Sequence, residues 1–270
     1  MILLHIKMSY SVQHVTGPSQ GNHDYDMSIY RPLDGGVFPS SGEEYPFVVW
    51  GNGWGQGDSS ESPTEGYQPG FLEWVDAGWI VVACNQWSVQ ESDLTEALEW
   101  LVDQHTTSGS EYEGVIDIDH IILAGHSQGA GAAVKAGGHQ MVTATIVMNP
   151  FGPSFVNPGD QSGPMLLLGG SLDEATPFSH FESVWHAVQE NQIGGIYASY
   201  GGGTHNSEAW APDDDYYSPG DYNFGGYQEP TNLWLKFILE GSSAVGRSLK
   251  RKLNKSPWET EYAFSDEFEL

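Results

Sequence analysis

The stretch His120–Ala136, HIILAGHSQGAGAAVKA, decides the fold. Its first five residues are rich in β-branched and other apolar side chains, which predicts a buried strand over His120–Ala124. The mostly small residues Ala130–Ala136 predict a helix that can pack closely on a sheet. The pentapeptide between them, Gly125-His126-Ser127-Gln128-Gly129, predicts a tight turn, because glycine tolerates backbone conformations that other residues avoid. This order of strand, sharp turn and helix is typical of a sheet whose strands are connected by helices.

The rest of the chain continues this alternation of strand and helix. We expect the α/β class, with a mostly parallel central sheet covered by helices on both faces. The first strands, among them Tyr25–Tyr30, are expected to be antiparallel. The predicted buried strands are Pro46–Trp50, Trp79–Cys84, Val142–Met148, Met165–Leu168 and Ile196–Tyr200. The predicted helices are Gly66–Ala77, Ser92–His105, Phe181–Gln189 and Asn232–Glu240.

Length and charge distribution give the domain organisation. The 270 residues suffice for one large domain, and we assign residues 1–246 to it. Residues 247–270 are interpreted as a charged C-terminal tail, with a solvated helix as the alternative. This segment holds five of the nine basic residues of the chain, namely Arg247, Lys250, Arg251, Lys252 and Lys255.

The chain is strongly acidic, which excludes some classes of partner. It carries 36 acidic and 9 basic residues, for a formal net charge of −27. Such a surface repels nucleic acids and anionic membranes, so we expect neither as a partner. The scarcity of both Lys and Arg favours a halophilic protein whose charge repulsion is screened by salt over one that is merely very soluble. We also expect a monomer.

Several other features limit the interpretation of the sequence. No apolar run reaches the roughly 18 residues of a membrane span. Cys84 is the only cysteine, so no intrachain disulfide is possible. Met1–Met8 lacks the features of a signal peptide, which makes a cytoplasmic location the default and leaves secretion open.

The acidic run Asp213-Asp214-Asp215 has the donors for a hard cation such as Ca²⁺. A solvated loop is the preferred interpretation of this run, and we expect no metal or cofactor.

The central pentapeptide matches the pattern G-x-S-x-G. The pattern alone is weak in a chain rich in glycine and serine, but a strand directly before it and a helix directly after it are its diagnostic context. In that setting the serine lies on a strained turn, with its hydroxyl above the sheet and beside the positive end of the helix. Ser127 is therefore the candidate nucleophile. An ordinary serine in a turn is the alternative.

A serine hydroxyl needs a base, and the base needs an acid that orients it. Asp173 follows the strand Met165–Leu168, and His205 follows the strand Ile196–Tyr200 in a glycine-rich loop, so both are expected at the same sheet edge as Ser127. The rivals are Glu174 for the acid, and His126, His180 and His186 for the base. His126 is expected to point away from the site. His180 directly precedes a predicted helix and His186 lies in it, so both are expected to face solvent or the core.

Acyl transfer also needs N–H donors for the oxyanion. The N–H of Gln128, directly after the nucleophile, is expected to be one donor. The second should come from the loop after the strand Pro46–Trp50, with Asn52, Gly53 and Trp54 as candidates. We favour Trp54, because its ring can also flank a substrate.

Four motifs in this order resemble the polyesterase–lipase–cutinase family, which includes bacterial cutinases and PET-degrading hydrolases. They are GNGWG at 51–55, HIILAGHSQGAGAA at 120–133, PMLLLGGSLDEATP at 164–177 and YGGGTHNS at 200–207. The resemblance covers about Tyr25 to about Leu239. It implies an α/β-hydrolase fold and an open site for small or polymeric esters, with Phe151 and Trp54 as substrate-binding aromatics.

This sequence departs from the family in several respects, which weaken a polyester specificity more than an esterase activity. Gln128 and Ala130 stand where methionine and glycine are common, and the C-terminal disulfide of the group cannot form. The acidity is also atypical. The expected function is a serine carboxylic-ester hydrolase of cutinase or polyesterase type. A thioesterase, acyltransferase or peptidase on the same residues, and a hydrolase-like binding protein without activity, are the alternatives.

The net charge yields a first prediction. Because mutual repulsion of the carboxylates opposes folding, the unfolding temperature should rise as NaCl increases from about 0.05 M to about 3 M. Thermal unfolding followed by circular dichroism checks this. The halophilic interpretation is wrong if the midpoint is constant or falls over that range.

Overall fold

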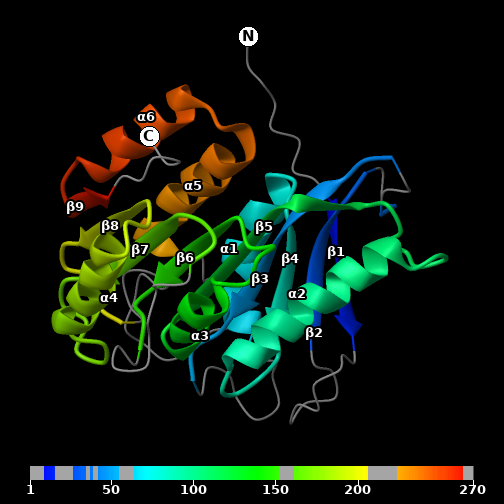
Figure 1. Ribbon diagram of the computed structural model, residues 1–270, viewed down its shortest axis with the longest axis horizontal. Coiled ribbons are helices and arrows are strands. Elements are labelled where there is room, and N and C mark those ends of the chain that lie inside the picture. The colour runs from blue at the N-terminus through cyan, green and yellow to red at the C-terminus, as the bar shows by residue number, and fades with distance from the viewer. Residues whose placement is uncertain are drawn as a thin grey trace.

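The computed structural model describes residues 9–15, 27–34, 37–38, 42–54, 64–151, 161–205, 224–263 and 270. Within them the chain forms a nine-stranded, mostly parallel sheet in the order β1-β2-β4-β3-β5-β6-β7-β8-β9 (Figure 1). The strands are β1 (Ser9–Val15), β2 (Met27–Leu33), β3 (Tyr45–Gly51), β4 (Ile80–Cys84), β5 (Ile116–His126), β6 (Ala144–Met148), β7 (Met165–Gly170), β8 (Gly195–Tyr200) and β9 (Trp258–Ala263).

The sheet is parallel from β4 to β8 and antiparallel at its two margins. β1 pairs with β2 and β2 with β4 in antiparallel fashion, as expected for the first strands, and β9 pairs antiparallel with β8. The central strands β3, β4, β5, β6 and β7 are almost completely buried where they pair, because helices cover both faces. This explains their continuous apolar sequences.

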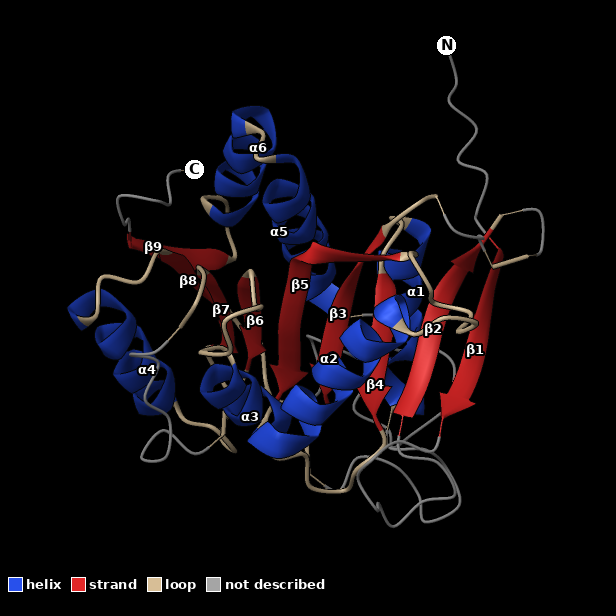
Figure 2. Cartoon of the chain, turned by 45° about the vertical axis from the view of Figure 1, so that its right-hand side comes forward, coloured by secondary structure: helices blue, strands red, loops and turns tan. Residues whose placement is uncertain are grey.

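Six α-helices of the described part lie on the two faces of the sheet (Figure 2). Helices α2 (Glu91–Thr106), α3 (Gln128–Ala136) and α4 (Phe178–Glu190) form a row along one face. Helices α1 (Gln68–Asp76), α5 (Gln228–Glu240) and α6 (Ser243–Leu253) pack on the other. Short 3₁₀ turns, η1 (Glu65–Tyr67) and η4 (Gly225–Tyr227), lead directly into α1 and α5.

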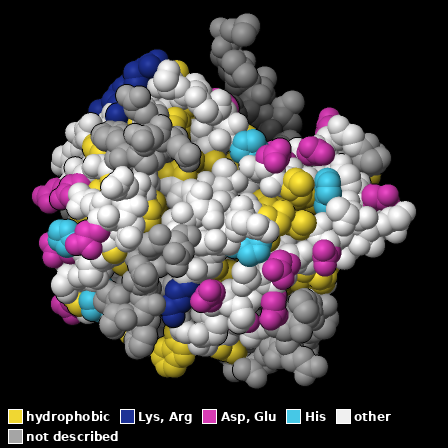
Figure 3. All heavy atoms as spheres, in the orientation of Figure 1, with side chains coloured by type: hydrophobic (Ala, Val, Ile, Leu, Met, Phe, Trp, Pro, Cys, Tyr) yellow, Lys and Arg dark blue, Asp and Glu magenta, His cyan; other side chains and the backbone are white. Residues whose placement is uncertain are grey.

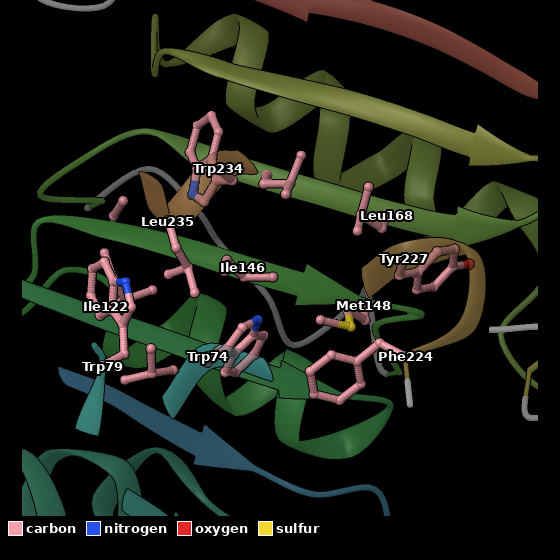
Figure 4. Packing of buried hydrophobic residues seen from close by; sticks show 14 of the residues in the cluster. Trp74, Trp79, Ile122, Ile146, Met148, Leu168, Phe224, Tyr227, Trp234 and Leu235 are labelled. Carbon is pink, nitrogen blue, oxygen red and sulfur yellow. The ribbon is translucent and has the colours of Figure 1, made fainter. Parts of the chain in front are cut away.

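The core beneath α1 and α5 is unusually aromatic. Trp50 of β3 lies at its centre, stacked on Phe224 with ring centroids 5.2 Å apart, and Trp74 contacts Phe224 at 4.8 Å. Figure 4 shows Trp74, Phe224, Tyr227 and Trp234 packed above Ile146 and Met148 of β6. Buried aromatic rings contribute large apolar areas and fix the helices on the sheet, so the strand ends of this half of the molecule are rigidly placed.

The division of the chain at residue 247 does not correspond to a structural boundary. Residues 243–253 form α6, and Val245, Leu249 and Leu253 on its buried face join the main core. β9 then extends the same sheet. The interpretation of 247–270 as a tail was therefore wrong for its described residues. Val245, Leu249 and Leu253 are spaced by four residues, which is typical of an amphipathic helix. The basic residues between them favoured a solvated segment instead.

The basic side chains occupy the outer face of α6. Figure 3 shows Lys and Arg atoms gathered over α6 at the upper left of the molecule. Lys252 pairs with the acidic Glu229 of α5, and the Lys250 ammonium donates to the backbone oxygen of Leu270 at 3.1 Å. The cluster therefore holds together C-terminal elements of an otherwise acidic protein.

The integration of β9 into the fold leads to a stability prediction. Trp258 is 7% exposed, and its ring contacts Tyr200 and Tyr227 at centroid distances of 4.8 and 5.6 Å. Trp258→Ala should lower the free energy of unfolding by about 3–5 kcal/mol, because it leaves a cavity in the core. Urea denaturation measures this. Glu259→Ala, on the exposed side of the same strand, is the control and should stay within about 0.5 kcal/mol of wild type. Equal effects of the two changes would contradict the prediction.

Candidate active site

The candidate site lies beside β3, at the point where successive strands are added first on one side of β3 and then on the other. From β3 the chain moves outward to β4, and from β4 it crosses back to β5 on the other side of β3. The helices that follow β3 and β5, α1 and α3, consequently lie on opposite faces. A crevice opens between the carboxyl ends of such a strand pair, which is where open α/β sheets bind ligands. The loop at 51–54 and Ser127 border this point.

Ser127 has the strained backbone expected of a nucleophile at a sharp turn. It connects β5 directly to α3 and has φ 53° and ψ −119°, a conformation that is costly for a non-glycine residue. A Cβ on Gly129 would lie 2.1 Å from the carbonyl oxygen of Gly51, and one on Gly125 would lie 2.5 Å from the Gly129 backbone. Both glycines of the pentapeptide are therefore required by close backbone contacts.

The structure brings Ser127, His205 and Asp173 together in one line of hydrogen bonds. The Ser127 Oγ lies 3.0 Å from Nε2 of His205, and Nδ1 of His205 lies 2.8 Å from Oδ2 of Asp173. The Asp173 carboxylate can only accept, so Nδ1 carries the proton and Nε2 accepts from the serine hydroxyl. The three residues follow β5, β8 and β7, at the carboxyl edge of the sheet. This is the arrangement of a general base held in one tautomer.

The surroundings of Asp173 keep its carboxylate ionised. Burial raises its pKa, but hydrogen bonds from His205 and from the Thr176 side chain and N–H outweigh burial, and the pKa is lowered overall. The N–H groups of Ala175 and Thr176 donate to Oδ1 at 2.9 and 2.7 Å. A carboxylate held by this many donors is fixed in orientation as well as in charge.

The rival residues are placed elsewhere, with one exception. Glu174 is exposed, and His180 and His186 belong to α4. His126, which we expected to point away from the site, instead has its ring 4.7 Å from the ring of His205. It is fully buried and donates from Nε2 to the backbone oxygen of His205 at 3.2 Å. The expectation was wrong because the strained turn directs the residue before the serine beneath the His205 loop.

The two expected oxyanion donors lie at appropriate places in the chain. Gln128 is the first residue of α3, where an N–H has no acceptor within the helix. In the loop after β3, the N–H of Gly53 donates to the Tyr67 hydroxyl at 3.2 Å. Of the candidates in that loop, this disfavours Gly53 and leaves Asn52 and Trp54, of which Trp54 stays our prediction.

The two predicted substrate-binding aromatics are solvent-exposed. The side chain of Trp54 is 72% exposed and that of Phe151 is 53% exposed, which is unusual for large apolar groups. The N–H of Phe151 donates to the carbonyl of Ser127 at 2.9 Å, so Phe151 lies beside the nucleophile. Leu172, which precedes Asp173 in the chain, is 61% exposed and is a third exposed apolar side chain, one that the sequence had not indicated.

Sequence reasoning missed the polar residues that support the triad. Thr176 donates its hydroxyl to Asp173 Oδ2, and its Oγ1 lies 3.3 Å from Nδ1 of His205. Asn149 is buried with a left-handed φ of 46°, and its Nδ2 donates to the His205 carbonyl at 3.2 Å. A signal existed for each: a threonine three residues after an aspartate favours a side-chain turn, and an asparagine at a strand end tolerates positive φ.

Some sequence expectations concern residues that the structure describes only in part or not at all. Asp213-Asp214-Asp215 and Met1–Met8 lie outside the described residues. Among the residues that are described, no group of three or more His, Cys, Asp and Glu side chains is arranged to hold a metal ion. Within the same part of the chain, none of the helices has the length and apolar character of a membrane span.

Comparison with known proteins gives no independent indication of function. No protein-family model matches the chain, and no curated protein matches it significantly.

The state of Asp173 predicts a pH dependence of stability. A carboxyl whose pKa is lower in the folded than in the unfolded chain, where it is about 3.9, stabilises the fold above that pH. The contribution is lost as the pH falls through the folded pKa. The difference in free energy of unfolding between wild type and Asp173→Asn should therefore be constant from about pH 6 to 8 and shrink below about pH 4.

Urea denaturation over this pH range measures the difference. Asp119→Asn is a suitable control, because the Asp119 side chain is exposed and lies near the start of β5, at the end away from Ser127. A wild-type to Asp173→Asn difference that grows in acid would contradict the assignment of the charged, hydrogen-bonded carboxylate.

Proposed function

We propose that this chain is a serine carboxylic-ester hydrolase with an α/β-hydrolase fold. The observation that carries the proposal is the continuous hydrogen-bonded line Ser127–His205–Asp173 at the carboxyl edge of a largely parallel sheet, with distances of 3.0 and 2.8 Å. The strained backbone of Ser127 between β5 and α3, and the chain order serine, aspartate, histidine, are those of a nucleophile elbow and its partners in this fold.

The proposed reaction proceeds through an acyl-enzyme. Nε2 of His205 takes the proton of Ser127 as Oγ attacks the ester carbonyl, and the N–H groups of Gln128 and Trp54 stabilise the oxyanion. His205 then protonates the leaving alcohol. Water, deprotonated by His205, attacks the acyl-enzyme and releases the acid. Asp173 stays ionised and stabilises the imidazolium of His205 in both half-reactions.

Exposed apolar side chains at chain positions next to the candidate site support a hydrophobic acyl or aromatic group as the substrate portion that binds. Trp54 follows β3, Phe151 donates its N–H to the Ser127 carbonyl, and Leu172 precedes Asp173. We therefore propose short-to-medium acyl esters or polyesters as substrates. The net charge of −27 disfavours polyanionic ones.

The proposal predicts which side chain is indispensable. Ser127→Ala should lower kcat for p-nitrophenyl acetate, butyrate and octanoate by at least about 10⁴-fold, because it removes the nucleophile. Hydrolysis is measured at low and at multimolar NaCl. Ser183→Ala, on the exposed side of α4, is the matched control and should retain activity. Circular dichroism verifies that every variant is folded.

The outcomes separate the alternatives. Activity on oxyesters that exceeds activity on acyl thioesters and peptide anilides supports the esterase, and the reverse supports a thioesterase or peptidase on the same residues. Release of soluble products from a polyester film tests the polymeric substrates. A folded wild-type protein that hydrolyses none of these at either salt concentration overturns the proposal and favours a binding protein.

A further inference from the structure

A second set of hydrogen bonds lies directly beneath the triad. It connects the loop after β3, residues 52–54, which we call the oxyanion loop, with His205. The N–H of Gly53 donates to the Tyr67 hydroxyl at 3.2 Å, and that hydroxyl lies 2.8 Å from Nδ1 of His126. On its other side, Nε2 of His126 lies 3.2 Å from the backbone oxygen of His205. His126 and Tyr67 are buried, so these bonds are shielded from water.

The direction of each bond in this set is fixed by chemistry. A carbonyl oxygen only accepts, so Nε2 of His126 must carry a proton and donate to His205. In a neutral imidazole Nδ1 is then the acceptor, and the Tyr67 hydroxyl donates to it while accepting from Gly53. Burial lowers the pKa of His126 well below its ordinary value, and repulsion by His205 lowers it further, so the ring stays neutral.

The same carbonyl receives a second buried donor from another strand end. Nδ2 of Asn149 donates to the His205 oxygen at 3.2 Å. The Oδ1 of Asn149 accepts from the N–H of Gly170 and from the Tyr227 hydroxyl, both at 3.1 Å. Asn149 is held in its left-handed conformation by these three bonds, and it connects the ends of β6, β7 and β8 with η4.

His205 requires such support, because residues 201–203 of its loop have no side chains and are fixed through backbone hydrogen bonds to neighbouring segments. The loop 201–205 begins with three consecutive glycines, which are the least restrained residues of a chain. A general base must nevertheless be held to within roughly 0.5 Å of its productive position. Two donors on the backbone carbonyl of His205 fix the residue from below, while Asp173 fixes its ring from the side.

We propose that Tyr67, His126 and Asn149 are positioning residues that fix the backbone of His205 and couple it to the oxyanion loop. This proposal rests on the proposed function. None of the three residues transfers a proton in the reaction. They act through His205 and Gly53, so their loss should slow the acyl-transfer steps more than it weakens substrate binding.

Tyr67→Phe tests the proposal with the smallest change of shape. It removes only the hydroxyl that joins Gly53 to His126, and the ring can keep its contacts with Trp50 and Phe71. We expect kcat for p-nitrophenyl butyrate to fall about 10- to 100-fold, with KM within about twofold of wild type. Tyr112→Phe is the matched control. It removes the hydroxyl of a similarly buried tyrosine, which contacts Gln13 and Arg31 beyond the opposite end of β5.

A pair of substitutions at His126 provides a rescue test. His126→Gln keeps an amide N–H for the carbonyl of His205, whereas His126→Leu removes it. We expect His126→Gln to recover at least about tenfold in kcat over His126→Leu. Thermal unfolding is measured for every variant. The loss of kcat in each His126 variant is then compared with the loss in Tyr112→Phe at a similar loss of stability.

A readout that is independent of turnover is the proton NMR signal of the Nδ1–H of His205, hydrogen-bonded to Asp173. It should broaden or shift in Tyr67→Phe and stay unchanged in Tyr112→Phe. The proposal is overturned if Tyr67→Phe alters kcat and this signal no more than Tyr112→Phe does. If the wild-type protein hydrolyses no ester, the proposed function fails, and the NMR signal alone decides whether the three residues position His205.

Discussion

The backbone of Gly129 lies against the backbone of Gly51, and the arrangement of the site depends on this contact. A single added Cβ would reach to 2.1 Å from the carbonyl oxygen of Gly51. The contact sets the distance between the start of α3 and the end of β3, which are the two elements that carry the candidate oxyanion donors. It also forces the turn between β5 and α3 to be sharp, so the strain at Ser127 follows from how closely the helix packs on the sheet.

The aromatic core beneath α1 and α5 fixes the strand that leads into this contact. Trp50 precedes Gly51 directly, and its ring is surrounded by Tyr67, Phe71, Trp74 and Phe224. Tyr67 belongs both to this aromatic core and, through its hydroxyl, to the polar set beneath the triad. The apolar packing therefore fixes the ring, and the fixed ring places a hydroxyl where two polar groups of the site need it.

The charge of the protein is distributed unevenly, and the fold explains how. The acidic residues are spread over the surface, whereas the basic ones are concentrated on α6, which packs beside α5 and precedes the edge strand β9. Contacts of Lys250 and Lys252 with Leu270 and Glu229 hold C-terminal elements together. Elsewhere Arg31 pairs with Glu111 and lies over the rings of Phe38 and Tyr112. Arg31, Lys250 and Lys252 thus lie where separate segments meet.

The sequence by itself determined the central part of this protein. Continuous apolar runs identified the parallel strands, since a strand buried on both faces has no polar side, and the strand–turn–helix context identified Ser127. Because parallel strands end at one edge of the sheet, their order in the chain also predicts that the loops carrying Asp173 and His205 lie beside Ser127. Local patterns were sufficient wherever periodicity or turn chemistry within a few residues decides the conformation.

Only the tertiary structure decided the rest. β9 has an ordinary alternating sequence, and its place at the edge of the sheet depends on pairing with β8, some sixty residues earlier in the chain. The roles of Tyr67, His126 and Asn149 depend on donors and acceptors that are 56 to 79 residues apart in the chain or lie on separate elements. No periodicity records which polar groups meet in a buried interior. A buried polar group must form a hydrogen bond, because water no longer reaches it. Which partner it finds depends on how distant segments pack, and so only the folded chain decides it.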